Sequence, residues 1–288
     1  MVRWSMSQPR VRISSRSDVS RGRFAFRRAS TIASASPILT LLTRVTLLAL
    51  LALLALLTLV PDEAAAEEAD VVLAQLDTGG QYNPRPDALR RLLWEVTQRT
   101  SIEASLEVVA LRAEDPKLFY HPLLYWSGRG AVPALSDAAV KALRRYLTYG
   151  GTILIDSADD EAGGAFDQSV RREMGRILPR VEFARVPTDH VVYKSFFLVD
   201  HQAGRVLRAP YLEAIAIEKR FAVIYSQNDL AGAWARDSFG RWEYDVSPGG
   251  ERQREMAFRL GINVVMYALC LDYKEDLVHI PFILKRRR

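Results

Sequence analysis

From residue 70 to residue 178, short apolar runs alternate with longer segments whose apolar residues recur at helical spacing. The runs are apolar throughout, which is typical of strands buried on both faces. Strands that alternate with helices favour a parallel sheet covered on both sides. The predicted strands are 70–76, 106–111, 123–126 and 152–155, and the predicted helices begin at Pro86-Asp87, after the capping Ser136, and at Asp167. We therefore expect an α/β fold.

The second half of the chain departs from this alternation. Residues 182–186 are predicted to form a fifth strand, and 212–218 with 221–225 an antiparallel hairpin that turns at Lys219-Arg220. Residues 253–271 form a predicted core helix, too short and too polar for a second membrane span. Because no repeat or low-complexity linker follows residue 70, we expect one domain over 70–284, with a solvated basic tail at 285–288.

Residues 1–66 have the pattern of a targeting segment. A basic stretch ends at Arg44, an uncharged, leucine-rich run occupies 45–60, and the small residues Ala64-Ala65-Ala66 follow. This order is typical of a cleaved secretory signal. The alternative is an uncleaved anchor in the inner membrane, although sixteen residues are fewer than the roughly 20 of a spanning helix. Both alternatives predict an extracytoplasmic, periplasmic domain.

The net charge of the chain reflects this segment. The formal charge of the whole chain is +5, but nine arginines lie in residues 1–44, where only Asp18 opposes them. Without residues 1–66 the formal charge becomes −1. A nearly neutral domain lacks the electrostatic attraction on which nucleic-acid binding depends, so we expect no nucleic-acid partner.

The single cysteine excludes several classes of protein. A disulfide scaffold, a CxxC zinc ribbon and an iron–sulfur protein each need several cysteines, and this chain has only Cys270. The histidines form no HxH or HExxH pair, so we expect no metal site and no cofactor. They are His121, His190, His201 and His279.

Several ordered motifs resemble the DUF4159 family of bacterial domains over about residues 70–284. They are YNPRP with the helix that follows it (82–102), FY leading to LLYWSGRG, LRRYLTYGGTILIDS (143–157), a TDH step at 188–190, IYSQNDLAGAW (224–234) and RLGINVVMYAL (259–269). The resemblance implies a flavodoxin-like three-layer α/β/α sandwich, related to class I glutamine amidotransferase-like and ThuA-like proteins. It implies no established activity. It also implies partners in cell-envelope systems with MoxR-type ATPases and von Willebrand A domains.

The sequence offers few candidates for catalytic residues. A glutamine amidotransferase needs a cysteine on a strand-to-helix elbow, whereas Cys270 lies within the apolar last helix, so this activity is excluded. Asp156 and Ser157 follow the fourth predicted strand, and His190 lies in the TDH step. We retain Asp156 and His190 as acid–base candidates and Ser157 as a candidate nucleophile. The alternative for each of the three is an ordinary structural role in a turn, cap or loop. The acidic loop 156–161 lacks the order of an EF-hand, which favours solvated surface charge.

Ligands of open parallel sheets bind outside the carboxyl ends of the strands. Here these ends carry glycines, flat aromatic rings and directional hydrogen-bonding groups, a combination that suits a sugar or a small polar ligand. The candidate ligand-binding residues are Gly79, Gly80, Tyr82, Asn83, Trp126, Arg129, Asp156, Asn228 and Asp229. The glycines do not have GxGxxG spacing, so nucleotide binding is not indicated.

Two functional hypotheses follow. The first is an exported or membrane-anchored domain that acts as a non-catalytic binding or assembly module in a cell-envelope system. The alternative is a hydrolase or sugar-modifying enzyme that uses the crevice at the carboxyl ends of the strands. Convergence of Asp156 and His190 within hydrogen-bond reach would favour the enzyme.

Overall fold

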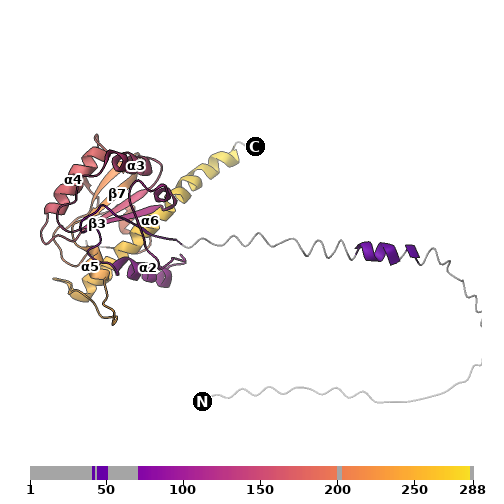
Figure 1. The fold of residues 1–288 in the computed structure, drawn as a ribbon, viewed down its shortest axis with the longest axis horizontal. Coiled ribbons are helices and arrows are strands. Elements are labelled where there is room, and N and C mark those ends of the chain that lie inside the picture. The colour runs from indigo at the N-terminus through magenta and orange to yellow at the C-terminus, as the bar shows by residue number, and fades with distance from the viewer. Residues whose placement is uncertain (1–40, 43, 51–70, 200–202, 286–288) are drawn as a thin grey trace, which may run out of the picture. The chain divides into compact units, whose positions relative to one another are not determined.

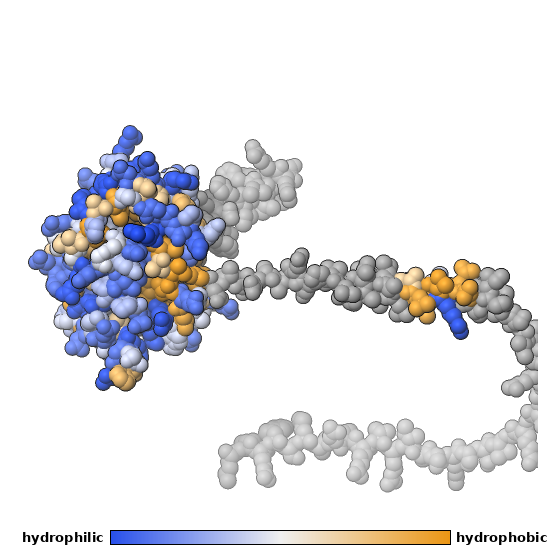
Figure 2. All heavy atoms as spheres, in the orientation of Figure 1, coloured by the Kyte–Doolittle hydropathy of each residue, from blue (hydrophilic) through white to orange (hydrophobic). Residues whose placement is uncertain are grey.

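A computed structural model describes residues 41–42, 44–50, 71–199 and 203–285, with side chains up to residue 270. The chain divides into two units, Met1–Ala65 and Ala66–Arg288. In the first unit the described residues are helical and expose leucine and valine side chains (Figure 2). Most of the predicted signal or anchor segment 1–66, namely 1–40, 43 and 51–66, lies outside the described residues, as does most of the basic tail. No helix within the described ranges is long and apolar enough to span a membrane.

The second unit is built on a mixed sheet flanked by helices (Figure 1). The sheet has seven strands in the order β2-β1-β3-β4-β7-β6-β5. The first five strands in this order are parallel, and β6 and β5 are antiparallel to their neighbours. The bounds are β1 Ala74–Leu76, β2 Val109–Leu111, β3 Leu123–Gly128, β4 Thr152–Ser157, β5 Ala184–Arg185, β6 Glu213–Ile217 and β7 Arg220–Ser226. The predicted α/β fold with a mainly parallel sheet and a late hairpin is confirmed.

Helices cover both faces of the sheet. One core is formed with α2, α5 and α6, and the other with α3 and α4. The helices are α2 Ala88–Arg99, α3 Asp137–Thr148, α4 Ala165–Ile177, α5 Leu230–Trp234 and α6 Gly250–Lys285, and two 3₁₀ helices are η1 Pro116–Tyr120 and η2 Val191–Tyr193. The predicted cap of α3 is confirmed, because the Ser136 hydroxyl accepts a hydrogen bond from the amide of Ala139 at 3.0 Å.

The packing of the central strands explains why the predicted strands are apolar throughout. In β3, Leu123 and Tyr125 belong to the core under α2, α5 and α6, whereas Leu124 and Trp126 belong to the core under α3 and α4. Successive side chains of a strand point to opposite faces, so both faces are apolar when both are covered. The sheet therefore lies between two helical layers, and its polar groups are concentrated at the ends of the strands.

Some boundaries differ from the prediction. The first two strands are shorter than expected, since β1 and β2 have three residues each. The hairpin turns at Glu218-Lys219, one residue earlier than predicted, and Glu218 adopts a left-handed φ of 56°. The last helix is longer at both ends than the predicted 253–271. The short helix α5 was not predicted, because five residues are too few to show helical periodicity.

Candidate functional site

The carboxyl ends of the parallel strands meet at one edge of the sheet, and most of the predicted site residues lie there. The direction of winding reverses between β1 and β3, which is where ligands of doubly wound sheets bind. Within this edge, Asp156 at the end of β4 is level with Ser127 on one side and Ser226 on the other. We call this region the carboxyl edge.

Asp156 is a deeply buried acid of the carboxyl edge, at 1% exposure. Its Oδ1 accepts the amide of Leu230 at 2.8 Å, and its Oδ2 accepts the amide of Ala231 at 2.9 Å and the hydroxyl of Tyr125 at 2.8 Å. Burial, reinforced by the charge of Asp229, raises the pKa of Asp156 to about 7 despite these three donors. The carboxyl group thus joins β4 to the first turn of α5.

Asp229 precedes α5 and forms the centre of a buried ion cluster. Its φ of 53° is left-handed, and its Oδ1 accepts the amide of Gly232 at 3.0 Å, which caps the helix. Arg85 contacts the carboxylate through two nitrogens, at 2.7 and 3.3 Å, and Arg205 through one at 2.5 Å. Burial by itself would raise the pKa of Asp229, but the two arginines outweigh it and hold this pKa below its ordinary value.

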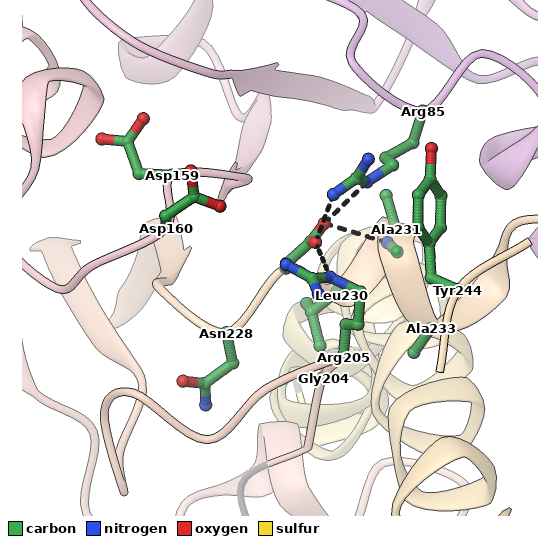
Figure 3. A network of polar contacts seen from close by, with 12 residues as sticks. Arg85, Asp159, Asp160, Gly204, Arg205, Asn228, Leu230, Ala231, Ala233 and Tyr244 are labelled. Atoms are coloured by element: carbon green, nitrogen blue, oxygen red, sulfur yellow. Dashed lines mark hydrogen bonds and ion pairs between the residues drawn. The ribbon is translucent and has the colours of Figure 1, made fainter. Parts of the chain in front are cut away.

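The two arginines reach the same carboxylate from different segments of the chain (Figure 3). Arg85 is 8% exposed, and its guanidinium group lies 3.9 Å from the centre of the Tyr244 ring. Burial by itself would lower the pKa of Arg85, but Asp229 reverses this effect and raises it. Arg85 lies between Pro84 and Pro86 in the YNPRP motif, but it was not among the predicted site residues. Its position between two prolines was the one sequence signal that could have marked it as a site residue.

Asn228 supports the segment that carries Arg205. Its Oδ1 accepts the amides of Arg208 and Ala209, both at 2.9 Å, and its Nδ2 donates to the carbonyl of Ala209 at 2.8 Å. The segment passes so close that a Cβ on Gly204 would lie 2.2 Å from the carbonyl oxygen of Asn228. All the polar atoms of this buried side chain are therefore used to hold a loop.

The predicted residues after β1 form a turn at the surface. Gly79 and Gly80 have φ of +75° and +61°, which explains two adjacent glycines. The amide of Gly79 donates to the Asp77 carboxylate at 2.9 Å. Gly80 is exposed, and Tyr82 and Asn83 are half-buried. The turn thus leaves four of the predicted residues accessible at the carboxyl edge.

The prediction that Trp126 offers a flat face to a ligand is wrong. Its ring is fully buried and contacts Phe166 edge-on, at 6.3 Å between ring centres. The reason is strand alternation, which turns this residue of β3 toward α4. Arg129, the first residue beyond β3, is accessible, and its guanidinium group pairs with Asp160 at 2.5 Å.

The acidic loop after β4 has a structural role in addition to surface charge. Asp159 is buried, and its carboxylate accepts the amides of Gly130 at 2.6 Å and Phe166 at 2.8 Å. The amide of Asp159 in turn donates to the hydroxyl of Ser157, which is 2% exposed. Asp160, at 73%, and Glu161 are the exposed acids of this loop. The expectation of solvated charge holds for Asp160 and Glu161 but not for Asp159, whose carboxylate accepts an amide from the first turn of α4.

His190 is not brought together with Asp156. Its Nδ1 accepts the amide of Val192 at 3.2 Å, and its ring lies 4.1 Å from the ring of Phe221. Phe221 is near the start of β7, whereas Asp156 pairs with Ser226 at its end. Five residues of strand separate the two positions by roughly 16 Å. Burial lowers the pKa of His190, as expected for an imidazole that fixes a loop.

Among the side chains that the structure describes, no group of three or more histidines, cysteines, aspartates or glutamates is placed to hold a metal ion. The Nδ1 atom of His121 lies 2.9 Å from the carbonyl oxygen of Val72, and Cys270 is a half-buried free thiol. His201 and the side chain of His279 lie outside the described residues.

Comparison with known proteins agrees with the motifs. No match is found among curated proteins. The model of a domain of unknown function, DUF4159, matches residues 72–269, which include every strand of the sheet and most of its helices. This match covers more than half of the chain, and the chain therefore belongs to the DUF4159 family.

Proposed function

We propose that this chain is an exported or membrane-anchored module that binds or assembles other components of a bacterial cell envelope and has no catalysis of its own. The strand order β2-β1-β3-β4-β7 supports a flavodoxin-like three-layer α/β/α sandwich as its scaffold. The order of basic, apolar and small-residue segments in residues 1–66 supports export to the periplasm. Partners of the MoxR and von Willebrand A type are proposed from the family resemblance alone.

One observation supports the proposed absence of catalysis. The buried acids of the carboxyl edge are bonded to groups of the fold itself: Asp156 to two amides and a hydroxyl, Asp159 to two amides, and Asp229 to two arginines and an amide. A general acid or base must reach the proton that it transfers, within hydrogen-bond distance of the substrate. Such access would require these interactions to break.

A single observation favours the alternative, a hydrolase or sugar-modifying enzyme. The pKa of Asp156 lies near 7, and carboxyl groups with raised pKa values are frequent at active sites. Against this, Asp156 is 1% exposed and its expected partner His190 lies near the other end of β7. The accessible residues Tyr82, Asn83 and Arg129 fit binding of a polar ligand better than proton transfer.

The experiment combines capture with genetic complementation. The full-length chain with a C-terminal tag is recovered from native membranes after cross-linking, and proteins enriched over an untagged strain are quantified by mass spectrometry. N-terminal sequencing of the recovered chain decides between signal and anchor, since a start near Glu67 indicates cleavage. We expect defined envelope partners, and we expect Asp156→Asn to complement a deletion strain when its folded amount equals that of the unmodified chain.

The opposite results would count against the proposal. Failure of the chain to reach the envelope would refute export. Absence of enriched partners would refute the assembly role. Loss of complementation by Asp156→Asn at equal folded amount would favour the enzyme, because a residue that only stabilises the fold is dispensable once the fold is present.

A further inference from the structure

Two adjoining cavities lie along α2, and none of the buried acids of the carboxyl edge lines them. The larger one, about 470 Å³, lies between α2, Leu106 and residues 236–238, and the smaller one, about 190 Å³, lies between α2, Trp242 and the first turns of α6. Both are lined by Arg91 and Arg236, so the cavities meet at these two side chains. We call the pair the α2 groove.

Arg91 and Arg236 have hydrogen-bonding capacity that the fold does not use. The Nε atom of each is buried and has no hydrogen-bond partner among the residues that the structure describes. Their other bonds are few: Arg91 pairs through Nη2 with Glu95, and Arg236 donates through Nη1 to the carbonyl of Gly240 at 2.8 Å. A buried donor without an acceptor is unfavourable, so an anion placed between the two guanidinium groups would be stabilised.

The two arginines also repel each other. Burial lowers the pKa of Arg91, and the positive charge of Arg236 lowers it further, although Glu95 opposes both effects. A bound carboxylate would relieve this repulsion. Because guanidinium nitrogens form a planar fork that matches the two oxygens of a carboxylate, the arginines suit that group well.

Each of the two guanidinium groups lies over the face of a tryptophan ring. Arg91 lies 4.0 Å from the centre of the Trp94 ring, and Arg236 lies 3.9 Å from that of Trp242. Stacking on an aromatic face leaves the edges of the guanidinium group, where its N–H donors are, free for an anion. Trp94 and Leu106 are 39% and 43% exposed and line the larger cavity. An apolar surface therefore adjoins the cationic centre.

The acids that line both cavities are engaged locally. In the smaller cavity Glu95 pairs with Arg91 and Arg99, Glu251 with Arg254, and Glu255 with Arg99 and Arg259. The larger cavity is lined by two aspartates. Asp87 lies 3.8 Å from Arg90. The carboxylate of Asp237 accepts the amides of Phe239 and Arg241, each at 2.9 Å, and the Nε of Arg241 at 3.1 Å. They leave the cationic centre between Arg91 and Arg236 available to a negatively charged partner.

We propose that the α2 groove docks an extended acidic segment of a partner protein, with one carboxylate between Arg91 and Arg236 and a neighbouring apolar side chain on Trp94 and Leu106. The two adjoining cavities, and the exposed apolar surface of Trp94 and Leu106 beside the arginines, fit a peptide better than a small anion, which needs no apolar contact. This inference rests on the proposed binding function and assigns that function to a surface.

The test measures binding of defined peptides to the full-length protein by fluorescence anisotropy. The probe is a fluorescein-labelled tetrapeptide of alternating leucine and aspartate, and its control carries asparagine in place of aspartate. We expect the acidic peptide to bind at least about ten-fold more tightly than its amide counterpart. Arg91→Gln and Arg236→Gln should each weaken binding of the acidic peptide by about ten-fold or more.

Two further variants keep the test decisive. Arg180→Gln is the matched control, because Arg180 is exposed, follows α4 on the other side of the sheet and lies outside both cavity linings, so it should leave the affinity unchanged. Trp94→Ala removes a half-exposed ring from the surface of α2, which makes it the substitution of choice if an arginine variant does not fold. It should weaken binding of both the acidic and the amide peptide.

Several outcomes would overturn the proposal. They are equal affinity for the acidic and amide peptides, unchanged affinity in the folded arginine variants, and complete displacement of the peptide by inorganic phosphate, which would indicate a small-anion site. Capture from native membranes separates this failure from failure of the proposed function. If Arg91→Gln still captures the same partners as the unmodified chain, the groove is not the docking surface although the binding function stands.

Discussion

Raising the pH from about 4 to about 8 should destabilise the fold through Asp156. In the folded protein, burial and the neighbouring charge of Asp229 raise the pKa of this carboxyl group from 3.8 to about 7. Between these two values the folded protein keeps a proton that the unfolded chain has released. The stabilisation is therefore complete below the unfolded pKa and is lost as the pH rises through the folded pKa.

The size of the effect follows from the shift. One unit of pKa corresponds to 1.36 kcal/mol, so a shift from 3.8 to about 7 lowers the free energy of unfolding by on the order of 4 kcal/mol across this window. Asp156→Asn removes the titration. It also replaces an oxygen that accepts from Ala231 and Tyr125 by an amide group, which should cost a constant amount of about 1–3 kcal/mol.

The assay is urea unfolding followed by circular dichroism at a series of pH values. The stability of the unmodified protein relative to Asp156→Asn should fall by about 3 kcal/mol between about pH 5 and about pH 8, so that the variant is the more stable of the two at the upper pH. His190, whose pKa is lowered by burial, adds stability as the pH rises, but it is present in both proteins and cancels in the difference. A difference that stays constant over the whole range would refute the reasoning, because Asp156 would then be ionised in the fold. Asp160→Asn changes a 73% exposed position in the same region, so the stability difference between this variant and the unmodified protein should stay constant between about pH 5 and about pH 8.

Two substitutions test the packing of the carboxyl edge. Arg85→Leu should lower the free energy of unfolding by about 3 kcal/mol, because Asp229 stays buried with Arg205 as its one remaining paired cation. Arg241→Leu, which breaks an exposed ion pair, should change the free energy of unfolding by less than about 1 kcal/mol. Equal effects of the two substitutions in thermal or urea unfolding would contradict the burial argument. Gly128→Ala should destabilise by about 1–3 kcal/mol, since its Cβ would lie 2.3 Å from the ring of Phe166, while Gly175→Ala in open space on α4 should be neutral or stabilising. An unchanged melting temperature in Gly128→Ala would show that the ring can move at little cost.

The sheet and its helices were largely predictable because their signals are local. Buried parallel strands are apolar runs, and amphipathic helices repeat every three to four residues, so β3, β4, α3 and α4 were placed within a few residues. The cap at Ser136 was predictable for the same reason, since a capping residue and the amide that it accepts are three positions apart. The short α5 has no such local signal.

The candidate site was predicted in its location but not in its organisation. The carboxyl ends of parallel strands converge, so Asp156, Asn228 and Asp229 were correctly expected near one another. Their burial was not foreseen, nor were the arginine partners of Asp229, because Arg85 is 144 residues away from it in the chain. Trp126 was assigned to the ligand-facing surface because the register of a strand apolar on both sides does not show which core a residue enters.

The sequence by itself determined the α/β class, the order of the main elements, the family and the concentration of positive charge before residue 45, because each of these depends on neighbouring residues or on ordered motifs. Only the tertiary structure decided which polar side chains are used to hold the fold and which remain available. It placed Asp156 and Asp229 in the interior as partners of amides and arginines, and it left two arginine Nε groups along α2 without acceptors among the described residues. The physical reason is that the energy of a charged group depends on its burial and on partners from distant segments, and both are set only when the helices pack on the sheet.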